Sequence, residues 1–268
     1  MATNHLINQS TYQPVNLSTS QLINYTLFLA DNALILGQRN SEWCGHGPVL
    51  EQDIAITNIS LDLIGQARNF YQYAASQIGG PATEDSLAYL RTEREFKNLL
   101  LVEQPNGDWA GTTLRQFFFS TYQYFLYLQL QNSTDEQLAA IAEKALKEVT
   151  YHLRWSSEWV IRLGDGTEES KDRMLAAIDE LWPFTGELFL PSAFEIQVAK
   201  EIVGADVAII QKEWQKKVAS VFEEATLPLP KDDIYMQRGG KDGVHTEHLG
   251  YILAEMQYLQ RTYPGCAW

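Results

Sequence analysis

The chain has 268 residues, of which 45% are hydrophobic and 20% are charged, and its two cysteines lie far apart in the sequence. These values predict a globular protein with a sizeable core and no disulfide framework or zinc-type cysteine spacing, as expected in a reducing cytoplasm. The net charge of −14 disfavours nucleic acid as a partner, and no stretch approaches the eighteen or so apolar residues that a membrane span requires.

The first twenty residues differ from the rest of the chain. Residues 1–20 contain no lysine, no arginine and no apolar core, so we expect a flexible tail rather than a signal or transit peptide. Residues 21–268 show no internal repeat and no low-complexity tract. They predict a single domain.

Apolar residues recur with helical spacing through almost all of this domain, and strand-like alternation is nowhere sustained. The expected helices span residues 21–36, 48–79, 92–104, 109–132, 134–164, 170–181, 206–225 and 245–262. Four of these helices are long and the others support them. The pattern predicts an all-α fold, a helical bundle with additional C-terminal helices.

Glycine, proline and capping residues mark several helix boundaries. We expect Gly37 to end the first helix and Pro48 to lie in the first turn of the second. Thr92 is followed three residues later by Glu, and Thr134 by Gln. Each spacing predicts a capping box at the start of a helix.

The stretch Glu148–Trp155, EVTYHLRW, resembles half of a metal site. Ferritin-like di-iron bundles use one Glu from each of two helices and a Glu-x-x-His from each of the other two. Here Tyr151 occupies the position of the His ligand, and His152 follows it one residue late. These two positions differ by about 100° around the helix axis, so His152 cannot simply replace the missing ligand.

The other long helices do not complete a set of iron ligands. No Glu-x-x-His occurs anywhere in the sequence. The first long helix offers Asp31, the second offers Asp62 with Gly65 in the His position, and the third contains no Asp or Glu. We therefore predict no catalytic residue and no bound metal in this chain. A structural polar network is the favoured interpretation of these residues: Asp31, Asp62, Glu148, Tyr151 and His152.

Five stretches of the sequence resemble one known family, and they are EWCGH (42–46), LDLIGQARN (61–69), NLLLVEQPNGD (98–108), YHLRW (151–155) and HTEHLGYILAEMQYLQR (245–261). From about residue 20 to its end, the chain is similar to the structural subunits of the multicomponent phenylacetyl-CoA epoxidases of bacterial phenylacetate degradation. The resemblance implies a ferritin-like fold and a hetero-oligomer with a homologous catalytic di-iron subunit, joined by further small and reductase subunits. It also implies that this chain has no cofactor of its own and that its polar core is what remains of a lost metal site. The alternative is an independent di-metal oxidase, oxygenase or iron store of the ferritin-like class, which metal content would distinguish.

The helix 109–132 carries aromatic residues on all its sides, and one core stripe cannot easily accommodate them. Core packing and contact with a partner subunit both remain open as their role. The candidates for a partner interface are Phe117, Phe118, Tyr122 and Phe125.

Residues 238–243, RGGKDG, predict a flexible basic loop in an otherwise acidic chain. We expect Arg238 and Lys241 to contact a partner subunit, with binding of the CoA phosphates or a plain solvated loop as alternatives. His245 and His248 begin the last helix, where capping and hydrogen bonding are favoured over metal binding. We include both histidines among the candidate contacts to CoA or to a partner.

Overall fold

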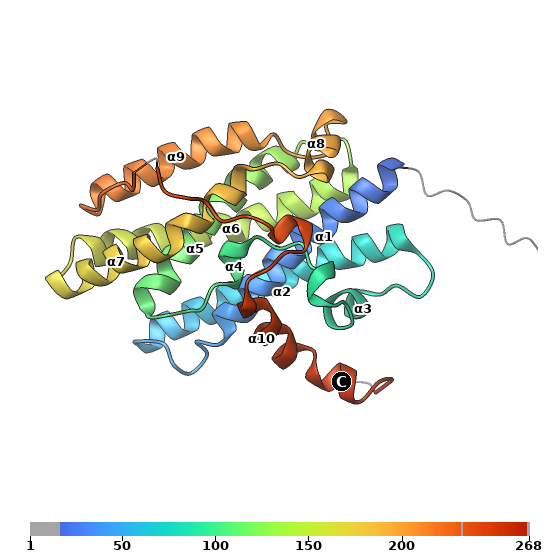
Figure 1. Cartoon of the computed structure of the whole chain (residues 1–268), viewed down its shortest axis with the longest axis horizontal. Helices are drawn as coiled ribbons and strands as arrows, with labels where there is room; N and C mark the ends of the chain where they lie inside the picture. The colour runs from blue at the N-terminus through green and yellow to red at the C-terminus, as the bar shows by residue number, and fades with distance from the viewer. Residues whose placement is uncertain (1–16, 232, 267–268) are drawn as a thin grey trace, which may run out of the picture.

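The structure is a computed structural model that describes residues 17–231 and 233–266 (Figure 1). This part of the chain contains α-helices, short 3-10 turns and no β-strand. The helices are α1 Leu17–Ser41, α2 Leu50–Ile78, α3 Glu84–Tyr89, α4 Leu100–Glu103, α5 Trp109–Leu130, α6 Glu136–Gly164, α7 Glu168–Leu181, α8 Ala193–Lys200, α9 Val207–Glu224, α10 Glu247–Met256 and α11 Tyr258–Thr262. The predicted all-α, ferritin-like bundle is confirmed.

The four long helices pack as two pairs. Helix α1 packs along α2, α5 packs along α6, and α2 contacts α6 across the bundle. Helices α7 and α9 lie against the α5–α6 pair, whereas α10 and α11 extend away from the body of the molecule (Figure 1). Helix α5 is therefore surrounded on several sides by other helices.

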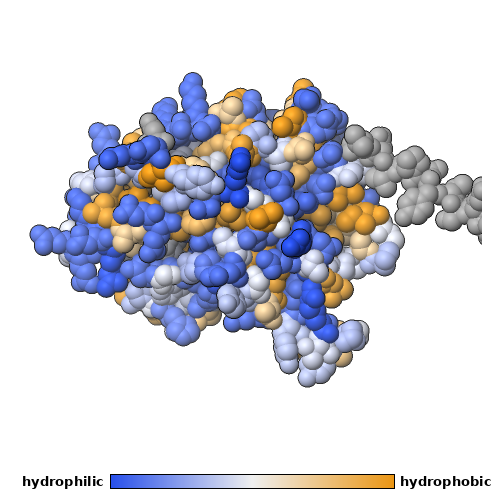
Figure 2. Space-filling view, viewed as in Figure 1, coloured by the Kyte–Doolittle hydropathy of each residue, from blue (hydrophilic) through white to orange (hydrophobic). Residues whose placement is uncertain are grey.

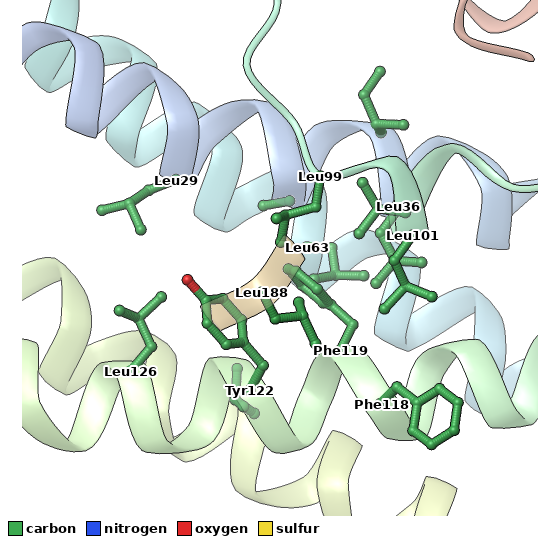
Figure 3. Packing of buried hydrophobic residues seen from close by; sticks show 14 of the residues in the cluster. Leu29, Leu36, Leu63, Leu99, Leu101, Phe118, Phe119, Tyr122, Leu126 and Leu188 are labelled. Atoms are coloured by element: carbon green, nitrogen blue, oxygen red, sulfur yellow. The ribbon is translucent and has the colours of Figure 1, made fainter. Parts of the chain in front are cut away.

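The core is continuous between these layers. Leu29 of α1, Leu99 of the segment before α4, and Tyr122 and Leu126 of α5 meet in it (Figure 3). The face on view in Figure 2 is mainly hydrophilic with scattered apolar residues, as expected of an acidic globular chain. No helix in residues 17–231 and 233–266 is long and apolar enough to cross a membrane.

The first two helix boundaries differ from those expected. Helix α1 begins at Leu17, four residues before the expected start, and residues 1–16 of the predicted tail lie outside the described residues. Gly37 does not end α1, which continues to Ser41. A Cβ atom at this position would lie 3.1 Å from Ile64 Cγ1 of α2, so the glycine allows close packing of the two helices. Pro48 lies before α2, whose N-cap is Val49.

The expected helix 92–104 is mostly irregular. The capping box of Thr92 and Glu95 is present, but it begins a single 3-10 turn. The backbone then leaves the helical path because side chains of other elements bind its N–H groups. Asp31 accepts from the N–H of Lys97 at 2.8 Å, and Asn32 accepts from that of Leu99 at 2.9 Å. Tertiary contacts thus override the local helical preference.

Other boundaries also required correction. The N-cap of α6 is Asp135, whose Oδ1 accepts from the N–H of Leu138 at 2.9 Å, and Thr134 instead donates to the carbonyl of Ile202 at 3.2 Å. The expected helix 245–262 is divided at Gln257 into α10 and α11. The short helices α3 and α8 were not expected.

Candidate functional site

A polar cluster lies between α2, α5 and α6, where the side chains of a bundle of this kind would hold metal ions. Hydrogen bonds link its members in two groups. One group joins Gln66, Gln123, Tyr127 and Glu148, and the other joins Asp62 and His152.

Gln66 of α2 is the centre of the first group, and its side chain is buried. Its Nε2 donates to Glu148 Oε2 at 2.9 Å. Its Oε1 accepts from Gln123 Nε2 at 3.0 Å and from the Tyr127 hydroxyl at 3.3 Å. Both ends of the amide are therefore used, and a neutral group occupies the middle of the bundle.

His152 of α6 contacts Asp62 of α2, with 3.0 Å between Nε2 and Oδ2. The His152 ring is fully buried, whereas 35% of the Asp62 side chain is exposed. The other ring nitrogen, Nδ1, is buried without a hydrogen-bond partner. The pair therefore joins α2 to α6 with the carboxylate at the edge of the bundle and the imidazole inside it.

Glu148 is a half-buried carboxyl with an elevated proton affinity. Burial raises its pKa above the usual range, and the nearby negative charge of Asp62 acts in the same direction. The hydrogen bond from Gln66 and the proximity of His152 oppose this rise without cancelling it. In this setting the carboxyl acts as the hydrogen-bond acceptor of the buried Gln66 amide.

These residues do not fit a di-iron centre. Two irons need carboxylates from all four helices and a His from two of them, with oxygen donors that bridge the ions. The α5 residues here are Gln123 and Tyr127, which are neutral, and only one His is present. In the part of the chain that the structure describes, no group of three or more His, Cys, Asp or Glu side chains is placed to hold a metal ion.

The structure separates Asp31 and Tyr151 from the polar core in which we expected them. Asp31 is buried beside Arg91, with which it forms an ion pair, and it accepts from the Tyr71 hydroxyl at 2.6 Å. Tyr151 is exposed on α6, with its ring 6.3 Å from that of His152. Asp62, Glu148 and His152 are the three predicted residues that lie together.

The loop 238–243 is packed rather than flexible, which corrects the expectation for Lys241. A Cβ atom at Gly240 would clash with the backbone of Asn98, so the loop lies directly on that segment. Lys241 is buried and donates to both carboxylate oxygens of Glu195 at 3.1 and 2.9 Å. Its charge is neutralised within the chain, so Lys241 does not form a basic surface. Arg238, in contrast, is exposed.

His245 is also an internal residue. Its Nδ1 lies 2.9 Å from Glu103 Oε2 and its Nε2 lies 3.0 Å from the carbonyl oxygen of Phe96. Both ring nitrogens are therefore used to hold the start of α10 against the segment before α4. His248 is half-buried, and together with Arg238 it keeps some accessible surface for a CoA or partner contact.

The aromatic residues of α5 are mainly core residues. Phe117, Phe118 and Tyr122 are buried within this chain, which excludes them from a surface interface. Of the two roles left open by the sequence, core packing holds for these three residues, because α5 packs against α6, α7 and α9 and not along one stripe only. Phe125 is half-buried and, with Tyr124, lines a surface hollow of about 470 Å³ beside α6 and α9.

Sequence reasoning missed the two amides at the centre of the site. The ligand pattern of a di-iron site contains only Asp, Glu and His, so it does not point to Gln66 or Gln123. A usable signal was present, since Gln66 lies four residues after Asp62 and therefore on the same face of α2.

Comparison with known proteins identifies the family of this chain. The chain belongs to the family of phenylacetic acid catabolic proteins, whose family model matches residues 5–268. It is similar to a protein of Escherichia coli (strain K12) that is one of the subunits of the 1,2-phenylacetyl-CoA epoxidase. The two are 51% identical over 249 residues, which cover 93% of this chain and 100% of that protein.

Proposed function

We propose that this chain is the non-catalytic structural subunit of a phenylacetyl-CoA epoxidase that acts in aerobic phenylacetate degradation. In this proposal it pairs with a homologous di-iron subunit, which carries out the epoxidation, and small and reductase subunits complete the cytoplasmic complex. The similarity to the Escherichia coli epoxidase subunit supports the assignment to this complex.

The observation that carries the non-catalytic role is the amide pair Gln66 and Gln123. Their hydrogen bond, at 3.0 Å, crosses the bundle where a di-iron protein needs acidic ligands. An amide is a weak neutral donor to a hard cation compared with a carboxylate, and it cannot balance the charge of two iron ions. The chain then contributes a fold that supports the partner, and iron and oxygen chemistry belong to the partner.

Metal analysis tests the absence of iron directly. The purified chain is loaded anaerobically with ferrous iron, desalted and analysed, and we expect no stoichiometric iron. The Glu148→Gln variant serves as the control for iron bound at the centre. Two irons retained per chain by the wild type and lost together in Glu148→Gln would contradict the proposal and favour an independent di-metal oxidase.

An omission assay tests the role in the complex. Epoxidation of phenylacetyl-CoA is followed with the catalytic, small and reductase subunits, with and without this chain. We expect no turnover by this chain without the iron subunit, and reduced turnover or stability of the iron subunit when this chain is omitted. Full turnover in its absence would overturn the structural role.

A further inference from the structure

The outer face of α2 exposes large apolar side chains at helical spacing. Leu50, Ile54 and Leu61 are 71%, 52% and 61% exposed. A helix turns by about 100° per residue, so positions 50, 54 and 61 lie on one side over about three turns. The α1 and α6 helices cover other sides of α2, and this side has no cover from the described chain.

Gly65 lies one turn beyond Leu61 on the same outer side of α2. Glycine inside a helix is destabilising relative to alanine, so its presence there calls for a structural explanation. Gly37 of α1 has such an explanation within the chain, since its Cβ would lie 3.3 Å from Leu63 Cβ. A Cβ on Gly65 would meet nothing within 4 Å. The space above Gly65 is therefore available for the close approach of another backbone.

Charge indicates what kind of chain approaches. The net charge of −14 makes a second copy of this chain an unfavourable neighbour. The two acids Asp62 and Glu148 also lie where α2 and α6 meet, beside the outer face, and the Asp62 side chain is 35% exposed. Asp62 contacts His152 of α6, and Lys144 of α6 lies near Glu148. A less acidic chain with Lys or Arg at this edge would complement the partly exposed Asp62 carboxylate.

We propose that the outer face of α2, defined by Leu50, Ile54, Leu61 and Gly65, docks an apolar-faced helix of a different and less acidic chain. The helix crosses α2 closest at Gly65, where two helices can approach without an intervening side chain. It places a basic residue against the partly exposed Asp62. The inference rests on the proposed function, and the occupant is then a helix of the catalytic subunit.

A pair of matched substitutions tests the face. Ile54→Arg places a charge in the middle of it, and Ile209→Arg makes the same change on α9 at a residue with similar exposure, 55%. Affinity for the purified catalytic subunit is measured for the wild type and both variants. We expect Ile54→Arg to weaken binding at least tenfold and Ile209→Arg to leave it within twofold.

Gly65→Ala gives a result that a purely structural role would not give. Alanine is the better helix former, so the variant chain alone should melt at a higher temperature than the wild type. The added methyl group separates the two helices, so affinity for the catalytic subunit should fall several-fold. A higher melting temperature with unchanged affinity would overturn the close approach at Gly65.

Four outcomes test this inference together with the function on which it rests. Loss of binding in Ile54→Arg alone supports both. Equal binding by the wild type and Ile54→Arg overturns the face and leaves the proposed function intact. Failure of the wild-type chain to bind any epoxidase subunit overturns the proposed function. If the chain instead binds a second copy of itself and Ile54→Arg abolishes this self-association, the choice of a different chain as occupant is overturned.

Discussion

The centre of the bundle and the layer beside α1 differ in the kind of polar side chain that they bury. At the centre, the neutral Gln66 and Gln123 are buried and the acid Asp62 lies at the partly exposed edge. In the layer beside α1, where the segments 91–103 and 239–246 dock, charged side chains are buried in pairs of opposite sign. These pairs are Asp31 with Arg91, Glu103 with His245, and Glu195 with Lys241.

The difference follows from the backbone. In long helices such as α2, α5 and α6, the N–H groups are satisfied within each helix, so a buried carboxylate would find few donors. The irregular segments have free donors, and their carboxylates use them. Glu103 accepts from the N–H and the hydroxyl of Thr246, both at 2.7 Å, and from Asn98 Nδ2 at 2.8 Å. Buried ion pairs therefore hold the irregular segments in place, whereas the amides Gln66 and Gln123 occupy the centre between α2, α5 and α6.

The largest expected effect is at the Asp31 and Arg91 pair. Arg91→Met leaves the Asp31 carboxylate buried without a counter-ion, and the free energy of unfolding should fall by about 3–5 kcal/mol. Urea denaturation of the full chain measures it. Arg173→Met is the control, because Arg173 forms exposed ion pairs with Asp108 and Glu169 and should change stability little. Equal losses in the two variants would show that the Asp31 carboxylate does not depend on Arg91 as its counter-ion.

Lys241 gives the next effect and tests the corrected view of its loop. Lys241→Met removes the counter-ion of Glu195, which keeps a hydrogen bond from the N–H of Ser192 at 2.8 Å, and we expect a loss of about 3 kcal/mol. The double variant with Glu195→Gln should recover part of this loss. Arg238→Met, in the same loop but exposed, is the control. If both single variants are equally mild, Lys241 is a surface residue after all.

The sequence predicted well what depends on local pattern. Long helices with apolar periodicity, such as 109–132 and 206–225, were found nearly to their ends, because spacing alone determines them. The count of acidic and histidine residues predicts an incomplete iron ligand set, and this stays a prediction until metal analysis tests it. Both inferences require only the identity and spacing of residues along one element.

The sequence could not show what depends on the surroundings of a residue. Lys241 looks like a surface cation beside glycines, and only the packing of the loop on Asn98 shows that it is buried. Thr92 has a complete capping box, yet Asp31 and Asn32 of α1 bind the backbone that should have continued the helix. Phe118 looks like an interface residue in the sequence because the helices that cover α5 come later in the chain.

Glu148 tests the hydrogen-bond network at the centre, with a smaller expected effect. Glu148→Leu leaves Gln66 Nε2 without its acceptor and should cost about 1–3 kcal/mol at pH 7. Glu148→Gln keeps an acceptor and should be milder than Glu148→Leu. Thermal unfolding measures both, with the exposed Glu143→Leu as the control on α6. Unchanged melting temperatures in both Glu148 variants would show that the side chain is solvated.

The raised pKa of Glu148 predicts how the effect of its substitution on stability changes with pH. Burial and the charge of Asp62 favour the protonated carboxyl in the folded chain. The stabilisation from that protonation is present below the unfolded value of 4.5 and is lost as pH rises through the folded pKa. Glu148→Gln, which cannot ionise, should therefore gain stability relative to the wild type as pH rises from about 4 to 7. The opposite trend would show that the centre favours a charged carboxylate.

The smallest expected effect is the pH dependence that His245 confers on the charged layer. Burial alone would lower the pKa of His245, but the hydrogen bond and charge of Glu103, together with the carbonyl of Phe96, raise it above 6.5. The folded chain therefore binds this proton more tightly than the unfolded chain does. The stabilisation is complete below pH 6.5 and is lost as pH rises through the folded pKa, with a slope of at most about 1.4 kcal/mol per pH unit for one proton.

Comparison with a variant isolates this contribution from other titrating groups. The free energy of unfolding is measured by urea denaturation from pH 6 to 9 for the wild type, His245→Gln and His46→Gln, His46 being exposed. We expect the wild type and His46→Gln to lose stability in parallel, because both keep the protonated His245 beside Glu103. His245→Gln should start less stable at pH 6 and approach the wild type as pH rises, because it has no proton to lose. A constant difference between His245→Gln and the wild type across this range would mean that the Glu103 contact holds a neutral imidazole, and that the layer beside α1 does not depend on charge at this pair.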